Sequence, residues 1–282
     1  MRLAELAALT FCATVLHAAD PQIVSLLQQG DAEVSRRNLP AALGAFEQAE
    51  KIDPQNPEVL LRISQQNSDL IAEAPRPEEA KTFAHKALDF AERAVALAPR
   101  NAKAHLAVAV AYGRLTDFAT NKAKLEYSRN VKIEATRAAE LDPHEDYAFH
   151  VLGVWNYRVA NLGAVMKLLA KIIYGGIPEA SNEEAVRNFK KAIDLAPQRI
   201  IHHQELARVY DTSGKRELAR KEWQTVLALP AQNSTDEKAQ REAAEAVAKG
   251  SPLPRERQPA AQQTQSPERS DRPEPAKTGE GQ

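Results

Sequence analysis

The chain has 282 residues, of which 43% are apolar, 27% charged and 5% aromatic. Its 37 Lys and Arg residues nearly balance 38 Asp and Glu residues, and this balance argues against a nucleic-acid-binding protein, which needs a clustered excess of cations. A single cysteine excludes a disulfide framework and zinc clusters held by several thiolates. The 11 glycines form no GxGxxG, P-loop or GxSxG motif, so nucleotide-loop and nucleophile-elbow enzymes are not expected.

Residues 1–19 resemble a cleavable secretory signal peptide. Arg2 provides the basic start, residues 6–16 are largely apolar, and Ala18 and Ala19 offer small residues for cleavage. An apolar stretch of about eleven residues is too short to cross roughly 30 Å of hydrocarbon as a helix. We therefore expect a periplasmic or secreted protein. The alternative is an amphipathic first helix in a cytoplasmic protein that keeps its N-terminus.

Between the two ends of the chain, one amphipathic helical pattern recurs and each time stops at a proline. These marker prolines are Pro54, Pro99, Pro143, Pro197 and Pro230, with spacings of 45, 44, 54 and 33 residues. The tetratricopeptide repeat (TPR), a helical hairpin, has a period of about 34 residues. We therefore predict an all-α fold over residues 20–249: a right-handed superhelical array of about five TPR-like hairpins. The 54-residue spacing predicts an extra helix in the fourth unit.

Small and large residues alternate in these segments as TPR packing requires. Small residues let the two helices of a hairpin approach closely, and large residues fill the gap. The matching positions are Gly30, Ala42, Phe46 and Ala49 in the first unit, Gly153, Ala185, Phe189 and Ala192 in the fourth, and Ala207, Ala219 and Trp223 in the fifth. Two sequences, at 181–184 and 234–237, have the Ser-x-x-Glu pattern of a capping box.

The C-terminal region divides at Gly250. Residues 234–249 predict a polar-faced amphipathic helix, which would cover the last apolar face of the array. Residues 250–282 contain six of the 17 prolines and one large aliphatic residue, so we expect a disordered, Pro-rich tail. The tail is interpreted as a solvated segment, with a spacer or a proline-rich ligand as the alternative.

Several segments resemble the regulator of microtubule dynamics family. They are residues 111–118 (AYGRLTDF), 122–133, 151–160 (VLGVWNYRVA), 167–197 and 234–247. The resemblance is specific from about residue 102 to 250 and looser before it. It implies a TPR-like helical domain without catalytic residues; eukaryotic members are associated with microtubules or organelle membranes, and some with lipid. A secretory signal departs from that pattern and favours a bacterial-type secreted relative.

The first helix of each TPR unit lines the concave face of the array. Counting from each marker proline predicts a groove that is rich in cations and aromatic rings in units three to five. Arginine binds carboxylates and phosphates bidentately, which favours an acidic peptide terminus or an anionic head group. The alternative is a set of solvated helix faces with ion pairs between neighbours. The predicted groove residues are Lys103, Val110, Arg114, Tyr147, His150, Tyr157, Arg158, Gln204, Arg208 and Asp211, and in the second unit Leu61, Gln65 and Asp69.

The insert in the fourth unit predicts a basic amphipathic helix over residues 162–174. We weigh two interpretations: an extra helix packed on the repeats, or a docking helix for a membrane surface or a partner. Packing would hide Met166, Leu169 and Ile173, whereas docking would leave them exposed. Lys167 and Lys171 lie on the polar side of the helix.

Neither metal binding nor catalysis is expected. The seven histidines form no HExxH motif, and the adjacent His202 and His203 point about 100° apart on a helix. No cofactor is predicted. The leading hypothesis is a non-enzymatic scaffold that holds a peptide or partner protein in its groove. The alternatives are a module that binds anionic lipid or a membrane surface, and a microtubule-associated regulator.

Overall fold

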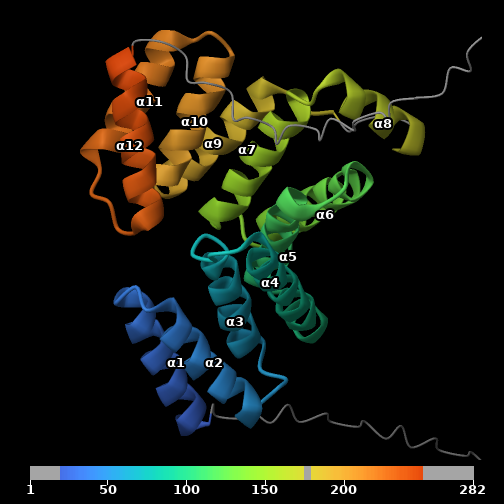
Figure 1. Cartoon of the computed structure of the whole chain (residues 1–282), viewed down its shortest axis with the longest axis vertical. Helices are drawn as coiled ribbons and strands as arrows, with labels where there is room; N and C mark the ends of the chain where they lie inside the picture. Colours follow the sequence, from blue (N-terminus) through green and yellow to red (C-terminus); the bar gives the residue numbers. More distant parts are fainter. Residues whose placement is uncertain (1–19, 175–178, 250–282) are drawn as a thin grey trace, which may run out of the picture.

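The structure, a computed structural model, describes residues 20–174 and 179–249, and over these residues it contains twelve α-helices and no strand (Figure 1). The predicted signal peptide (1–19) and Pro-rich tail (250–282) lie outside the described residues. The all-α prediction is confirmed. Ten helices pair into five hairpins that form a right-handed superhelical array, and two more helices are added to it.

Each hairpin consists of a first helix and a second helix that packs against it. The first pair is α1 (Pro21–Ser35) and α2 (Leu39–Ile52), followed by α3 (Pro57–Leu70) with α4 (Pro77–Leu97), and α5 (Ala102–Leu115) with α6 (Asn121–Leu141). The fourth pair is α7 (Asp146–Ala160) and α9 (Asn182–Leu195), and the fifth is α10 (Ile200–Thr212) and α11 (Arg216–Ala228). The added helices are α8 (Ala164–Tyr174) and α12 (Ser234–Lys249).

The marker prolines set the ends of the second helices. Helices α2, α4, α6, α9 and α11 each end two residues before their proline. Proline removes a backbone donor and disfavours helical geometry in the residue before it. In the second and third units an asparagine then caps the next helix: Asn56 Oδ1 accepts from the amides of Glu58 and Val59, and Asn101 does the same at the start of α5.

The long spacings have two structural causes. In units two and three the added residues extend the second helix, so that α4 and α6 have 21 residues each, whereas α2, α9 and α11 have 13 or 14. In unit four the added residues form α8, between α7 and α9. The predicted extra helix of the fourth unit is therefore confirmed.

Glycine allows the closest helix contacts in the first and fourth units. A Cβ atom on Gly153 of α7 would lie 2.7 Å from Cε1 of Phe189 on α9, closer than carbon atoms approach without displacement. Gly30 and Phe46 make the equivalent contact between α1 and α2. Phe46 and Phe189 are both fully buried. The glycines are thus required by the volume of the facing phenylalanines.

Helix α12 covers the exposed end of the array, as predicted. Its alanines, Ala239, Ala243 and Ala246, are buried in the same core cluster as Trp223 and Val226 of α11. The capping box predicted at Ser234 is wrong by one residue: Asn233 Oδ1 accepts from the amide of Asp236, and Ser234 is already helical. At the other predicted box, the Ser181 side chain does cap α9 by accepting from the amide of Glu184.

Candidate functional site: the concave face of α7, α10 and α12

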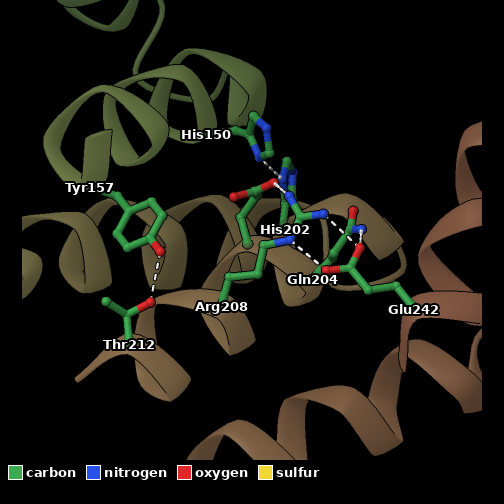
Figure 2. A network of polar contacts seen from close by, with 8 residues as sticks. His150, Tyr157, His202, Gln204, Arg208, Thr212 and Glu242 are labelled. Carbon is green, nitrogen blue, oxygen red and sulfur yellow. Dashed lines mark hydrogen bonds and ion pairs between the residues drawn. The ribbon is translucent and has the colours of Figure 1, made fainter. Parts of the chain in front are cut away.

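Two buried histidines join the fourth and fifth units. His150 of α7 and His202 of α10 lie with their Nδ1 atoms 3.0 Å apart (Figure 2). The Nε2 atom of His202 lies 2.8 Å from the Asp146 carboxylate. Because a carboxylate can only accept, His202 Nε2–H donates to Asp146. The His202 Nδ1 then accepts from the Nδ1–H of His150. Arg199 also pairs with Asp146, at 3.1 Å, and so completes a chain of four polar side chains.

Burial keeps both rings of this pair neutral. It lowers the pKa of His150 well below its ordinary value, and the neighbouring His202 and Arg199 act in the same direction. Burial also lowers the pKa of His202 to about 4, although the hydrogen bond to Asp146 opposes this. Tyr147 stacks on the His150 ring, with ring centroids 4.8 Å apart and planes inclined by 10°. The pair is therefore a neutral, hydrogen-bonded contact between helices.

Arg208 of α10 is held by a carboxylate of the same chain. Its Nε and Nη2 lie 2.8 and 2.6 Å from the two oxygens of Glu242 on α12, and Nη1 lies 2.6 Å from Glu205 (Figure 2). Gln204 also donates to Glu242, at 2.7 Å. This bidentate geometry is the strongest that arginine makes with a carboxylate. Arg208 and Gln204, which the sequence predicts in the groove, are thus bound to the capping helix.

The half-buried Tyr147 of α7 has charged side chains from several units near it. Burial raises the pKa of its phenol, and the charges of Arg114, Asp69, Arg199 and Glu205 all lie close enough to act on it. Arg114 belongs to α5 and Asp69 to α3, so the first helices of units two to five share one face. Arg114 is exposed, and none of the ion pairs among the described residues involves it. It is therefore a cation available to a ligand.

The surrounding protein also changes the pKa of the Asp69 carboxyl on α3. Its side chain retains access to solvent, but surrounding protein raises the pKa of its carboxyl to about 6 by removing hydration, against the opposing charge of Arg114.

The remaining predicted groove residues divide into exposed and buried ones. Lys103 and Arg158 are exposed, whereas His150 and Gln204 are buried with exposed fractions of 4% and 7%. Tyr157 is half-buried, and its hydroxyl lies 2.7 Å from that of Thr212 (Figure 2). In the second unit Leu61 is half-buried and Gln65 exposed. Whether these residues bind a partner stays a prediction.

Four residues that organise this face were not predicted to belong to it: Asp146, Arg199, His202 and Glu242. His202 was considered only as a metal ligand, although its first-turn position on α10 faces α7. Glu242 had a usable signal: a solenoid cap lies along the last helices, so its polar residues meet theirs. Among the described residues, no group of three or more His, Cys, Asp or Glu side chains could hold a metal ion.

The apolar residues that α8 exposes differ from those that the docking interpretation named. Its most exposed large side chains are Val165, Leu168 and Ile172, with exposed fractions of 74%, 60% and 73%. Met166 and Leu169 are half-buried, and Ala170 is buried. Lys167 and Lys171 are exposed, while the side chain of Ile173 lies outside the described residues. One side of α8 is thus packed, on α6, and another faces solvent.

None of the helices over residues 20–174 and 179–249 is both long enough and apolar enough to span a bilayer.

Comparison with known proteins identifies a family. The family model of regulator of microtubule dynamics proteins 1–3 matches residues 22–251. Human regulator of microtubule dynamics protein 2 is 29% identical over 186 residues, which is 66% of this chain and 45% of that protein. Mouse regulator of microtubule dynamics protein 1 is 30% identical over 142 residues, covering 50% of this chain and 46% of the relative. The chain therefore spans about half the length of such relatives.

A solved structure supports the fold. A thermophilic TPR protein from Thermus thermophilus superposes with a TM-score of 0.60 at 20% identity, covering 80% of this chain and 99% of that one.

Proposed function

Because the chain belongs to the regulator of microtubule dynamics protein 1–3 family and has a TPR-like fold, we propose that it is a non-enzymatic scaffold that holds a peptide or partner protein on its concave face. The observation that carries this proposal is the exposed Arg114 on α5, the first helix of the third unit, among the charged side chains that lie near Tyr147. Its guanidinium offers a donor pair for a carboxylate. We propose an acidic segment as the occupant.

The internal contact with Glu242 supports this choice of partner chemistry. Arg208 and Gln204 hold a glutamate that is carried by a helix of the same chain. The fifth unit therefore binds a carboxylate in the manner proposed for an external partner at Arg114. The difference is that α12 occupies the fifth unit, whereas the surface around Arg114 remains accessible.

Affinity capture with the full chain tests this proposal. We would compare wild type, Arg114→Ala and Arg220→Ala, since Arg220 is also an exposed arginine and lies on α11, the second helix of the fifth hairpin. The captured proteins would be quantified by mass spectrometry. We expect Arg114→Ala to lower recovery of specific partners at least tenfold and Arg220→Ala to leave it unchanged. Equal recovery with all three proteins would remove the groove assignment.

A second candidate function, binding to an anionic membrane surface, is favoured by α8. Its exposed Val165, Leu168 and Ile172 stand next to Lys167 and Lys171, a combination suited to lying at the interface of an anionic bilayer. The neighbouring α6 adds a cavity of about 550 Å³ that combines basic and apolar side chains. Two glutamates also line it, so that its full lining is Arg129, Lys132, Ile133, Glu134, Thr136, Arg137, Glu140 and Trp155.

Vesicle co-sedimentation distinguishes this candidate from the first. We would replace Val165, Leu168 and Ile172 by serine and use vesicles of phosphatidylglycerol, with phosphatidylcholine vesicles as the control. The membrane proposal predicts sedimentation of wild type with the anionic vesicles only, and its loss in the triple variant. Failure of wild type to sediment with either vesicle would exclude it.

A third candidate is the microtubule-related role that the names of the relatives indicate. Co-sedimentation with stabilised microtubules tests it directly. The expectation of an envelope location is a separate proposal, and N-terminal sequencing of the mature protein tests it: a chain that still begins at Met1 would contradict secretion by cleavage.

A further inference from the structure

The turn between α1 and α2 has an unusual backbone. Arg37 has a φ of +60°, and it is the one non-glycine residue with positive φ over residues 20–174 and 179–249. The fifth unit has Gly214 in the equivalent turn, seven residues after the small residue of its first helix, with a φ of +72°. Glycine adopts this conformation without steric cost, whereas arginine does not. An arginine retained at this position points to a role for its side chain.

The Arg37 side chain reaches the opposite end of the array. Its Nη1 lies 3.1 Å from a carboxylate oxygen of Glu237, in the first turn of α12, and its Nη2 donates to the Gln232 carbonyl at 3.3 Å. These partners are 200 and 195 residues away along the sequence. In Figure 1 the array curves into an arc, and its first and last units approach each other at the α1–α2 turn and the loop before α12.

The local structure fixes the direction of this side chain. The Glu33 carboxylate, near the end of α1, accepts a hydrogen bond from the Arg36 guanidinium at 2.6 Å and from the side-chain amide of Asn38 at 2.9 Å. The residues on both sides of Arg37 are thereby tied back to α1. Arg37 is left to point away from its own hairpin, toward Glu237.

We infer that the bond from Arg37 to Glu237 and Gln232 closes the array into a ring and controls access to its concave face. With the bond made, a partner segment must thread through the ring; with the bond broken, the arc opens at the α1–α12 side and admits a folded partner. This inference rests on the proposed binding role of the concave face, but not on which ligand that face holds.

The exposure of the bond makes it reversible. The Arg37 and Glu237 side chains are 53% and 45% exposed, so water and salt compete with the ion pair. The contact is therefore suited to opening and closing and not to permanent closure.

Distance measurements between spin labels test this inference. The full chain, with Cys12 replaced by serine, would carry labels at Gln29→Cys and Lys238→Cys, both exposed positions on α1 and α12. In 50 mM NaCl we expect a narrow distance distribution. Arg37→Gly, or wild type in 1 M NaCl, should shift the distribution to longer distances and broaden it.

Two further variants make the result specific. Glu237→Gln leaves the α1–α2 turn unchanged and should give the same opening as Arg37→Gly. Arg187→Ala removes an exposed arginine that pairs with Glu184 inside α9, far from the α1–α2 turn in the sequence, and should leave the distribution as in wild type. If neither Arg37→Gly, Glu237→Gln nor 1 M NaCl changes the distribution, the ring-closing role is wrong.

Discussion

Helices α8 and α12 are both amphipathic additions to the five hairpins, yet they contact the array in opposite ways. Helix α12 presents Ala239, Ala243 and Ala246, which are 1%, 0% and 6% exposed. Helix α8 presents Val165, Leu168 and Ile172, all more than half exposed, and buries Ala170. The larger apolar side chains are thus the less covered ones.

The physical reason for this difference lies in side-chain size and polar partners. Alanine allows α12 to approach α10 and α11 closely, and Glu242 then reaches Arg208. Helix α8 packs mainly on α6, and its one described hydrogen bond to a neighbouring segment is that of Lys167 to the Ala160 carbonyl, at 3.4 Å. Apolar periodicity alone therefore does not show which face of an added helix is covered. Small residues together with a complementary polar group do indicate the covered face.

The largest expected effect is that of replacing a glycine inside a packed hairpin, compared with a glycine just before α8. Gly153→Ala, in α7, would place Cβ against the buried Phe189 ring, and we expect a loss of about 3 kcal/mol in the free energy of unfolding from overpacking. Gly163→Ala, just before α8, meets no atom within 4 Å and should change stability by less than about 0.5 kcal/mol. Urea unfolding followed by circular dichroism measures both, and equal effects would contradict the packing difference.

Acid provides the second contrast, because the interface between α7 and α10 contains buried histidines and α8 contains none. The folded-state pKa of His202 is about 4, below the ordinary 6.5, so its contribution to stability is present above pH 6.5 and is lost as the pH falls toward 4. From pH 7 to pH 5 we expect His202 to account for a loss of about 2 kcal/mol. Unfolding of wild type and His202→Gln at both pH values gives this difference.

His203 should show the opposite pH dependence. Burial lowers the pKa of His203, but hydrogen bonds to Glu222 and to the Pro197 carbonyl outweigh it and raise the pKa. Its contribution is therefore complete below pH 6.5 and is lost at higher pH. The exposed His144, replaced by glutamine, is the control for both histidines. If the free energy of unfolding of His202→Gln changes with pH in parallel with that of the control, the loss of stability in acid is not due to His202.

The third contrast concerns the ion pair that holds α12. Arg208→Ala leaves Glu242 and Gln204 without this partner on a half-buried surface, and we expect a loss of about 1 kcal/mol. Hydrogen exchange of the α12 amides should accelerate, because the helix frays from α10. Arg220→Ala, on the exposed side of α11, should change neither quantity. Unchanged α12 exchange in Arg208→Ala would show that the alanine contacts alone hold the helix.

The sequence was sufficient for the local rules of this fold. Each marker proline stops a helix through its own backbone, and Gly153 and Phe189 fill one shared volume, so both signals act over short distances. The structure of the 10 or 11 residues added in units two and three was harder to predict, because such a stretch can form a loop or, as here, lengthen a helix. Only packing against the neighbouring unit decides between these outcomes.

The polar contacts of the candidate site depend on the superhelix as a whole. His150 and His202 are 52 residues apart, Arg208 and Glu242 are 34 apart, and Arg37 and Glu237 are 200 apart. Their meeting is set by the rotation from one unit to the next, and this rotation is not encoded in any single segment. Residue spacing placed Arg208 on the concave face, but the identity of its partner required the position of α12.

The smallest expected effect completes the comparison at α8. Leu168→Ser should alter the free energy of unfolding by less than about 0.5 kcal/mol, because a side chain that is 60% exposed has little burial to lose. The matched change in α12, Ala243→Ser, introduces a hydroxyl at a fully buried position and should cost about 1–3 kcal/mol if it finds no partner. Urea midpoints of the two variants measure the difference. A loss at Leu168 as large as that at Ala243 would mean that the outer face of α8 is covered in solution, and the docking role proposed for this face would then have to be abandoned.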